Sequence, residues 1–329
     1  MPKPSSTLTS EWQHLINQIG ITTTGVDGDF GGGTASATLQ TFKIDPIFSD
    51  CKVPDSDEEL QILLDKGHSY LTQFASTLTP RVLDPANPYD RLYSAYSSQG
   101  KKLGVDVSRC QGAVNWEFIV KQSPELYFAI CKATDGPNGY DSEFLFNIKG
   151  IVENGLKLGV YSVIQPNVPA KLQTDALFAY LEKAGGIVPA MFLIDFETAH
   201  SSNIDLVAQN VHEYERLVEE YYKAHDKTPV VLIYTYPGYI YEFGKRFDDD
   251  NMALATYSGQ PTPAKCQITS QRTWLYQFGG WTSTTLPWVS SGPLSSDKTA
   301  GIRLQARPHQ WIPVDHDVIL SPDLEQLIG

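Results

Sequence analysis

The ten residues MFLIDFETAH, at positions 191–200, join an apolar run to two acids that stand one residue apart. Alternate side chains of a β-strand point to opposite faces. The segment therefore predicts an apolar face and an acidic face, formed by Phe192, Ile194 and Phe196 and by Leu193, Asp195 and Glu197 respectively. Two acids at a strand end repel each other and lose hydration, which indicates that the protein uses them. A solvated loop that begins after the strand is the alternative.

From residue 101 onward, β-rich and helical segments alternate. The β-rich segments are KKLGVDVS, LYFAICKAT, LGVYSVI, PAMFLIDFE, PVVLIYTY, MALATYS and RTWLYQF. Apolar residues at helical spacing separate several of them, at 143–157, 171–184 and 204–225. This alternation predicts an α/β fold with a parallel sheet, and the number of strands favours an irregular TIM-like barrel over an open sheet. Short connections between the last strands predict an incomplete ring of helices.

Residues 1–76 have a different pattern, which predicts a small three-helix domain. The expected helices are 9–19, 34–43 and the segment after Ser56, with N-terminal caps at Ser10, at Thr34 and at the pair Ser56 and Glu59. Residues 77–100 are rich in Pro, Ser and Tyr, and we expect a linker packed on its neighbours. Residues 101–329 then form the barrel.

Composition excludes several classes of partner. The net charge of −13 disfavours nucleic acid, because phosphate binding needs a basic surface. No apolar run reaches the ~18–20 residues of a membrane span, and the first residues have no secretory pattern. We therefore expect no membrane segment and synthesis in the cytoplasm. The four cysteines lack metal-type spacing and no strand is followed by a glycine-rich phosphate loop, so we expect neither a metal nor a cofactor.

Motifs of the second half resemble those of glycoside hydrolase family 25, the Chalaropsis-type lysozymes. In chain order they are GVDVSRCQGAVNW (104–116), AICKATDG (129–136), GVYSV (159–163), FLIDFE (192–197), ATY (255–257), WLYQF (274–278) and PVDHDV (313–318). The resemblance spans nearly all of 101–320. It implies a β/α barrel that cuts the β-1,4 bond between N-acetylmuramic acid and N-acetylglucosamine.

The family's four acids match Asp106, Asp195, Glu197 and Asp315. We expect Glu197 to be the general acid, because its neighbours Asp195 and Phe196 raise its pKa. Asp195 would orient the N-acetyl group of the substrate or stabilise the developing positive charge, through either a covalent or a substrate-assisted intermediate. Asp106 and Asp315 have electrostatic or hydrogen-bonding roles, with a purely structural role for Asp106 as the alternative. Asp317 is expected to serve a turn.

Aromatic residues near strand ends are candidates for stacking on sugar rings, with an ordinary place in the core as the alternative. They are Tyr161, Tyr234, Tyr257, Trp274 and Tyr276, and Gln277 is a candidate polar contact to the glycan. The family's usual Tyr-His-Phe is replaced here by Tyr161, Ser162 and Val163, so a substrate contact is replaced or lost. The role of the polar segment 279–310, which contains Trp281 and Trp288, stays open.

The first half resembles a three-helix peptidoglycan-binding domain, through VDGDFG (26–31), Thr34 and Phe42. A generic helical bundle with a glycine turn is the alternative. A wall-binding module together with the missing secretory pattern suggests a bacteriophage endolysin, made in the host cytoplasm and released to the cell wall with the help of a holin-type membrane protein. We expect a monomer. Its partner would be peptidoglycan, reached from the periplasm or the extracellular face. A bacterial autolysin exported by another route is the alternative source.

Two rival functions remain. A chitinase-like barrel also ends a strand with Asp-x-Glu, but it has two further aspartates upstream, where this chain has Ala190 and Leu193. The other rival is a wall-binding or virion structural protein without activity, which the intact set of acids disfavours.

Overall fold

The computed structural model describes residues 4–21, 26–86, 88–198, 203–255, 272–279, 303–307, 310–313 and 315–329. The chain divides into two compact units. The first comprises Met1–Arg81, Gly112–Pro124 and Leu304–Ile312, and the second comprises Val82–Gln111, Glu125–Arg303 and Pro313–Gly329. The segment 112–124 therefore groups with the N-terminal residues, although it lies within the expected barrel in the sequence.

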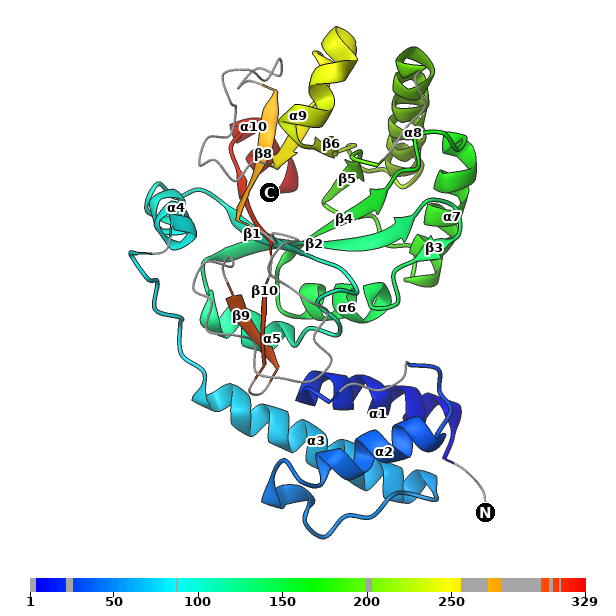
Figure 1. Ribbon diagram of the computed structural model, residues 1–329, viewed down its shortest axis with the longest axis vertical. Coiled ribbons are helices and arrows are strands. Elements are labelled where there is room, and N and C mark those ends of the chain that lie inside the picture. Colours follow the sequence, from blue (N-terminus) through cyan, green and yellow to red (C-terminus); the bar gives the residue numbers. More distant parts are fainter. Residues whose placement is uncertain are drawn as a thin grey trace. The chain divides into compact units, whose positions relative to one another are not determined.

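The first unit is helical. Its elements are α1 (Ser6–Ile19), α2 (Gly32–Thr41), η1 (Pro46–Phe48), α3 (Asp57–Thr77), α5 (Trp116–Gln122) and most of the two-stranded sheet of β9 (Arg303–Arg307) and β10 (Gln310–Pro313). Helices α1 to α3 are blue in Figure 1. Apolar residues at three- and four-residue spacing form the core, including Trp12, Leu15, Ile16 and Ile19 of α1, Leu60, Leu63, Leu64 and Leu71 of α3, Phe48 and Phe118.

The predicted helix caps are correct at one of three places. The hydroxyl of Ser56 accepts a hydrogen bond from the backbone N–H of Glu59, as expected at the start of α3. Helix α1 begins earlier than predicted, so Ser10 lies inside it. Thr34 also lies inside its helix, because Gly31 takes the cap position of α2.

The side chain of Gln13 on α1 holds the glycine turn of the first unit together. Its Oε1 accepts from the backbone N–H groups of Asp27 and Gly28, at 3.1 and 3.0 Å. Its Nε2 donates to Asp27 Oδ1 and to Thr34 Oγ1, both at 2.9 Å. Gly28 has a φ of +72°, a conformation that glycine adopts without strain. The hydroxyl of Thr34 is thus engaged by the turn and is not a helix cap.

The second unit contains a closed barrel, as predicted. Among the described residues its strands are β1 (Leu103–Val107), β2 (Leu126–Asp135), β4 (Lys157–Val163), β5 (Met191–Asp195), β6 (Val231–Thr235), β7 (Met252–Ala255), β8 (Thr273–Gly279) and β11 (Asp315–Ile319). Consecutive strands from β1 to β8 in this series pair in parallel. Strand β11 is antiparallel to both of its neighbours, β8 and β1, and closes the barrel between them. The short β3 (Gly139–Tyr140) pairs with the end of β2.

Because β11 runs against the others, its N-terminal end lies with their C-terminal ends. Asp315, the first residue of β11, is therefore paired with Asp106 near the end of β1. The opposite end of the barrel is apolar. There Leu324 and Ile328 of α10 (Pro322–Ile328) join a buried cluster with Phe128, Met191 and Leu232.

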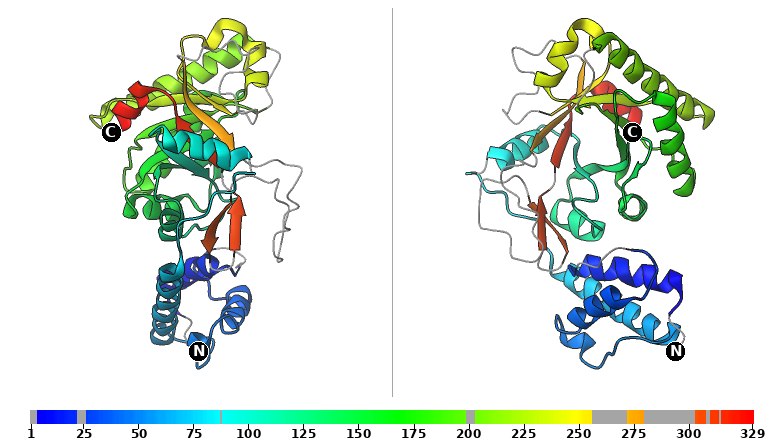
Figure 2. Two further views of the ribbon diagram at one scale, coloured as in Figure 1. Left: turned by 90° about the vertical axis from the view of Figure 1, so that its left-hand side faces the viewer. Right: turned by 45° about the vertical axis from the view of Figure 1, so that its right-hand side comes forward.

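Helices α6 (Phe144–Glu153), α7 (Ala170–Lys183) and α8 (Ile204–Ala224) lie outside the strands (Figure 1). Helices α7 and α8 pack side by side (Figure 2). The connection between β6 and β7 contains α9 (Pro237–Ile240) and η2 (Tyr241–Phe247). The residues between β7 and β8, which bear on the expected gap in the helical ring, lie outside the described part. No helix of the described residues has the length and apolar character that crossing a membrane requires.

Helix α4 (Pro88–Ser98) occupies the segment 77–100 that the sequence indicated to be a linker. It packs against β1 and β8 of the barrel. Tyr93 is fully buried, and its ring meets that of His316 edge-on at 5.3 Å. Tyr96 packs on Phe278 at 5.4 Å. Residues 88–98 are thus a helix of the second unit that packs on the barrel, whereas the sequence predicted a linker there.

Candidate active site

Strand β5 has the two faces that its sequence predicts. Leu193 belongs to the cluster inside the barrel. Phe192 stacks on Tyr214 of α8, with ring centroids 6.4 Å apart. Phe196 is fully buried among Tyr239, Phe243 and Phe247 of α9 and η2. Packing of the apolar face against these helices turns the acids toward the barrel interior.

One pocket at the C-terminal ends of the parallel strands gathers the predicted acids. Its lining residues are Asp106, Ile130, Tyr161, Leu193, Asp195, Glu197, Tyr234, Gln277, Asp315 and Asp317. The four acids expected from the sequence are all present, together with a fifth, Asp317. Asp106 comes from β1, Asp195 ends β5 and Glu197 follows it, and the other two acids come from β11. A pocket at this end of a parallel barrel is where such folds place their active sites.

Asp195 and Glu197 differ in exposure. Asp195 is 7% exposed, whereas Glu197 is exposed at the rim. Burial, and secondarily the charge of Glu197, raises the pKa of Asp195 well above its ordinary value. Partial burial also raises the pKa of Glu197. The nearby ammonium group of Lys132 on β2 opposes both shifts. The pair is therefore suited to holding a proton at a pH where an ordinary carboxyl group is ionised.

The segment after β5 is held by hydrogen bonds at Thr198. The hydroxyl of Thr198 donates to the carbonyl oxygen of Ile164 at 2.8 Å, next to the end of β4. The hydroxyl of Tyr239 donates to the carbonyl oxygen of Thr198 at 2.5 Å. These contacts fix the backbone on the C-terminal side of Glu197.

Asp106 belongs to a hydrogen-bonded chain across the pocket. Gln277 Nε2 donates to Asp106 Oδ2 at 2.7 Å. Gln277 Oε1 in turn accepts from the hydroxyl of Tyr234 at 2.9 Å. Burial raises the pKa of Asp106 well above its ordinary value, with Asp317 as the next cause. Gln277 therefore contacts an acid of the site, in addition to lining the pocket.

Asp317 does not serve a turn, contrary to the sequence-based expectation. It lies within β11, is 2% exposed and faces the pocket with Asp315. Burial raises its pKa well above the ordinary value, and the charge of Asp315 adds to the shift. The alternation DHD, with both acids on one face of an extended segment, was the signal for this residue.

The candidate sugar-stacking residues separate into two groups. Tyr161 and Tyr234 line the pocket. Trp274 and Tyr276 do not, because alternation along β8 turns Leu275 and Gln277 inward. Tyr276 is fully buried and lies 6.3 Å from Tyr96 of α4.

Trp274 lies at the N-terminal end of β8, away from the pocket mouth, and its carbonyl oxygen accepts from Leu320. Tyr276 thus follows the alternative of an ordinary place in the core, and Trp274 is half-buried against the apolar cluster of the barrel. Tyr257, Trp281 and Trp288 lie outside the described residues.

In the altered Tyr-Ser-Val motif, Tyr161 faces the pocket and Ser162 faces away from it. Ser162 is 1% exposed and its hydroxyl lies 2.6 Å from that of Thr134 on β2. Ser162 therefore links two neighbouring strands of the sheet in place of a substrate contact.

Metal-type donors gather on the outer surface of the barrel, away from the pocket. Within the described residues, His212, Glu215 and Asp250 each bring one donor atom within 4.8 Å of the others. His212 Nε2 and Asp250 Oδ2 are 3.1 Å apart. This hydrogen bond raises the pKa of His212, which favours an ion pair. Pairing between the side chains accounts for the arrangement.

Cys51, Cys110 and Cys131 are free thiols, and Cys266 lies outside the described residues.

A family model described as "Glycosyl hydrolases family 25" matches residues 105–284, more than half of the 329-residue chain. The uncharacterized protein YegX of Escherichia coli (strain K12) is 30% identical over 131 residues, which cover 39% of this chain and 46% of YegX. Lysozyme M1 of Streptomyces globisporus is 34% identical over 94 residues, which cover 29% of this chain and 31% of that protein. The chain thus spans half or less of the length of these relatives.

Two solved structures resemble the chain at low identity. A family GH25 lysozyme from Aspergillus fumigatus has 20% identity and a TM-score of 0.49, with 70% of this chain and 99% of that chain covered. The catalytic domain of endolysin ply40 from bacteriophage P40 of Listeria monocytogenes has 18% identity and a TM-score of 0.49, with 70% and 98% covered. The family match contains the β1 and β5 acids within its bounds, and by it this chain belongs to glycosyl hydrolases family 25.

Proposed function

We propose that this protein is an N-acetylmuramidase, which hydrolyses the β-1,4 bond between N-acetylmuramic acid and N-acetylglucosamine in peptidoglycan. The gathering of Asp106, Asp195, Glu197 and Asp315 in one pocket at the barrel mouth carries this proposal. Glycoside hydrolysis requires an acid that protonates the leaving oxygen and a second group that supports the cationic sugar. The lysozyme among the relatives supports the choice of glycan.

Glu197 is the general acid in this proposal. It stands at the rim, where the glycosidic oxygen of a long polymer can reach it, and its raised pKa keeps the proton available. Protonation of the leaving oxygen lets the bond to the anomeric carbon break without releasing an alkoxide.

Asp195 acts on the sugar ring or on its N-acetyl group. Its Oδ1 is buried and has no hydrogen-bond partner among the described residues, so an acceptor stands ready for the substrate. An amide N–H of an N-acetyl group would satisfy it, which favours substrate orientation. The alternative, direct support of the positive charge by the carboxylate, uses the same group. Tyr161 and Tyr234 offer apolar ring faces to the sugar.

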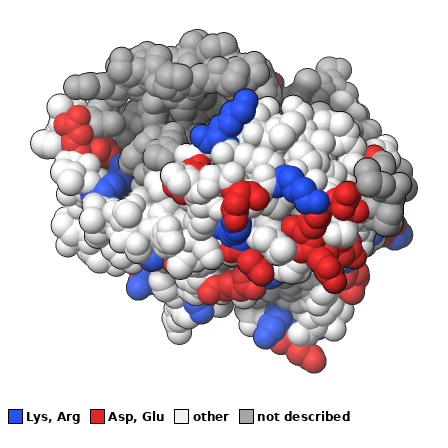
Figure 3. Space-filling view, turned by 90° about the horizontal axis from the view of Figure 1, so that it is seen from below, with Lys and Arg blue, Asp and Glu red and all other residues white. Residues whose placement is uncertain are grey.

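The first unit is proposed to hold the enzyme on its insoluble substrate, within residues 1–76. The turn ordered by Gln13 supports this role, because it presents the segment 26–31 in one defined conformation. Retention on the wall raises the local concentration of the catalytic barrel. On the face seen in Figure 3, acidic side chains gather in groups with basic ones standing among them, which is unsuited to a phosphate polymer. We further propose that the protein is a monomeric bacteriophage endolysin, released to the wall with the help of a holin.

Digestion of purified peptidoglycan tests the proposed bond. The products are reduced with borohydride and analysed by mass spectrometry. Reduced N-acetylmuramic acid at the new ends is the expected result, with Glu197→Gln as the inactive control. Reduced N-acetylglucosamine would place the cut at the other glycosidic bond. No new ends would favour the wall-binding or structural alternative, and cleavage of chitin oligomers in their place would favour a chitinase-like enzyme.

A further inference from the structure

The register of β1 and β11 places an additional acid beside Asp106. Asp106 pairs with Asp315, and Gly104 pairs with Asp317. Because residues two apart share a face, all three acids face the barrel interior. A Cβ at Gly104 would stand 2.1 Å from the ring of Phe128, so an aromatic ring fills the space beside this glycine. Asp317 therefore lies between an apolar floor and the carboxyl group of Asp106.

The contacts of Asp106 and Asp317 require a proton between them. Gln277 Nε2 already donates to Asp106 Oδ2 at 2.7 Å. The side chains of Asp106 and Asp317 are also hydrogen-bonded to each other. Ionised carboxylates only accept hydrogen bonds, so one of the two must carry a proton. Asp317 Oδ2 has no further hydrogen-bond partner among the described residues.

The charges around the pair favour retention of that proton. The neighbouring titratable groups are Asp315 on β11, Asp195 and Glu197 at the end of β5, Tyr161 on β4, Tyr234 on β6 and Lys132 on β2. The acidic members of this set oppose a second negative charge. Lys132 acts on Asp195 and Glu197, and it is paired with Asp135 at 3.0 Å. Two ionised carboxylates side by side in this position would repel strongly.

We propose that Asp317 is a positioning residue for Asp106, with which it shares a single proton. The shared proton fixes the carboxyl group of Asp106 against Gln277 and gives the pair one negative charge. Loss of the proton would separate the two groups by repulsion and misplace Asp106. This inference rests on the proposed function of the pocket, and it adds a fifth acid to the four expected there.

Two substitutions separate the parts of this proposal. In Asp317→Asn an amide N–H can still donate to Asp106, and the site keeps one negative charge without the titrating proton. In Asp317→Ala no donor remains. We expect kcat on peptidoglycan to fall by less than about tenfold in the first variant and by at least a further tenfold in the second, with little change in KM. Val318→Ala, a buried change on the opposite face of β11, serves as the control for packing.

The pH profile gives a readout that a merely structural role would not move. In the wild type, loss of the shared proton and loss of the Glu197 proton both contribute to the alkaline limb of kcat/KM. In Asp317→Asn only the Glu197 proton remains, so the limb should become shallower and move to higher pH. Equal kcat values for Asp317→Asn and Asp317→Ala, or a profile for Asp317→Asn identical to that of Val318→Ala, would overturn the proposal.

Infrared spectroscopy of the full chain tests the shared proton without an activity assay. The carbonyl stretch of a protonated carboxyl group, assigned with ¹³C-labelled aspartate, should be present at pH 6 and be weakened in Asp317→Asn. Retention of the whole band in both Asp317→Asn and Asp106→Asn would refute proton sharing. A wild-type protein that has the band and releases no glycan ends would instead refute the proposed function alone.

Discussion

At the scale of single residues, the two acids of β5 share a strand end and differ in their surroundings. Asp195 is buried with an open acceptor atom, and Glu197 stands at the rim. Because the two carboxylates repel each other, the second of them ionises at a higher pH than an isolated carboxyl group does. In the proposed function, the accessible Glu197 transfers the proton and the buried Asp195 contacts the sugar.

Replacement of Glu197 by Gln should abolish glycan cleavage while leaving the fold intact. Gln has the shape of Glu but cannot donate a proton to the leaving oxygen. General acid catalysis contributes about 10²–10⁴-fold, so kcat should fall by at least that range. A reducing-end assay measures this, with circular dichroism as the folding control. Glu213→Gln, an exposed acid on α8, is the matched control. A folded Glu197→Gln protein with more than about a tenth of the wild-type rate would contradict the assignment.

Asp317→Asn should stabilise the protein at neutral pH. Burial raises the pKa of Asp317 in the folded state, so between the unfolded and folded pKa values the folded state binds more protons than the unfolded state. The free energy of unfolding therefore decreases as pH rises from about 4 through the folded pKa. Asn does not ionise, so the variant does not lose this part of the free energy of unfolding as the pH rises. The Tm of the variant should exceed that of the wild type at pH 7, with a smaller difference at pH 4. A difference that does not depend on pH would exclude this explanation.

At the scale of elements, α4 has the role of a barrel helix. Its tyrosines pack on β8 and β11 through Tyr276, Phe278 and His316. The segment looked like a linker because Pro, Ser and Tyr are weaker helix formers than Ala or Leu, and most of its apolar side chains are tyrosines. Propensity is a weak guide when tertiary contacts supply the stability.

Tyr93→Ala should therefore destabilise the barrel strongly. The side chain is fully buried, and removal of a large aromatic ring leaves a cavity. By analogy with other buried aromatic residues, we expect a loss of roughly 3 kcal/mol or more in the free energy of unfolding, measured with denaturant. Tyr241→Ala removes a ring that is 59% exposed and should change the free energy of unfolding by less than about 0.5 kcal/mol. Similar values for the two variants would show that α4 is dispensable.

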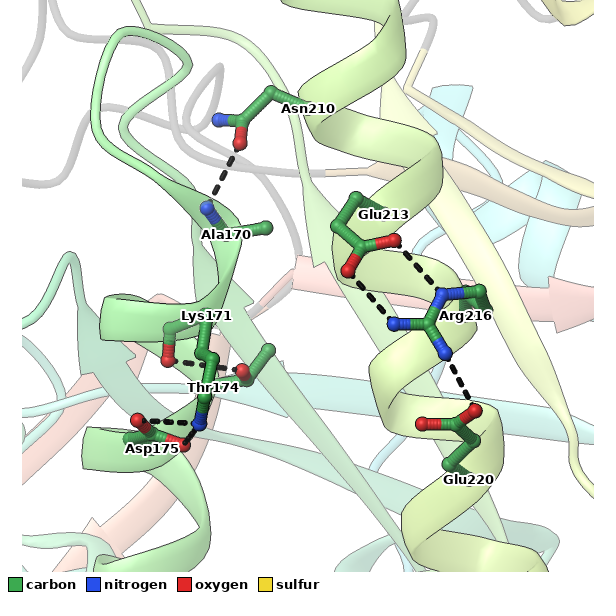
Figure 4. Close-up of polar contacts among 8 residues, drawn as sticks. All are labelled: Ala170, Lys171, Thr174, Asp175, Asn210, Glu213, Arg216 and Glu220. Atoms are coloured by element: carbon green, nitrogen blue, oxygen red, sulfur yellow. Dashed lines mark hydrogen bonds and ion pairs between the residues drawn. The ribbon is translucent and has the colours of Figure 1, made fainter.

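Helix α7 receives its N-terminal cap from a neighbouring helix (Figure 4). Its cap residue is Pro169, which provides no side-chain hydrogen bond. Asn210 of α8 accepts from the backbone N–H of Ala170 at 2.7 Å, as drawn in Figure 4. Its amide nitrogen donates to the carbonyl oxygens of Pro166 and Val168. The same side chain thus caps the helix and holds the connection that follows β4.

Asn210→Ala should reduce the free energy of unfolding by about 1–2 kcal/mol, because it leaves the start of α7 and two carbonyl groups without their partner. Lys171→Ala breaks an exposed ion pair with Asp175, also drawn in Figure 4, and should change the free energy by less than about 0.5 kcal/mol. Denaturant unfolding of both variants measures the two effects. A smaller loss for Asn210→Ala than for Lys171→Ala would contradict the capping role.

At the scale of the whole molecule, the two units are not successive stretches of chain. Helix α5 lies between β1 and β2 in sequence, but Phe118 belongs to the core of the helical unit, with its ring tilted against that of Phe74 at 5.3 Å between centroids. Lys121 Nζ donates to the carbonyl oxygen of Ala75, and the backbone N–H of Arg81 donates to that of Gln122. A cut between the units by sequence alone therefore separates α5 from its core.

Removal of residues 1–81 should leave a chain that is less stable than the full protein. Phe118 loses its apolar partners, so binding of a hydrophobic dye should increase and the Tm should fall. Retention on purified sacculi should also decrease, if the first unit holds the wall polymer. Phe118→Ser in the shortened chain should reduce dye binding without restoring retention. An unchanged Tm and equal retention would argue against both roles of the first unit.

Some features of this protein followed from the sequence alone. Alternation along 191–197 was enough to place Leu193, Asp195 and Glu197 inside the barrel, because a strand has only two faces and the apolar one must be covered. The strand pattern was enough to predict a closed barrel. The acids at the C-terminal ends of β1 and β5 then had to meet at one mouth.

The tertiary structure decided what depends on residues far apart in the chain. The pairing of Gly104 with Asp317 placed a fifth acid beside Asp106, and the antiparallel course of β11 brought Asp315 to the mouth. Gln277 faces the pocket, so its neighbour Tyr276 points to the other side of β8 and packs against α4. Local periodicity determines which residues share a face, but the register between strands and the choice of covering helix arise from packing across the whole fold, which no local pattern contains.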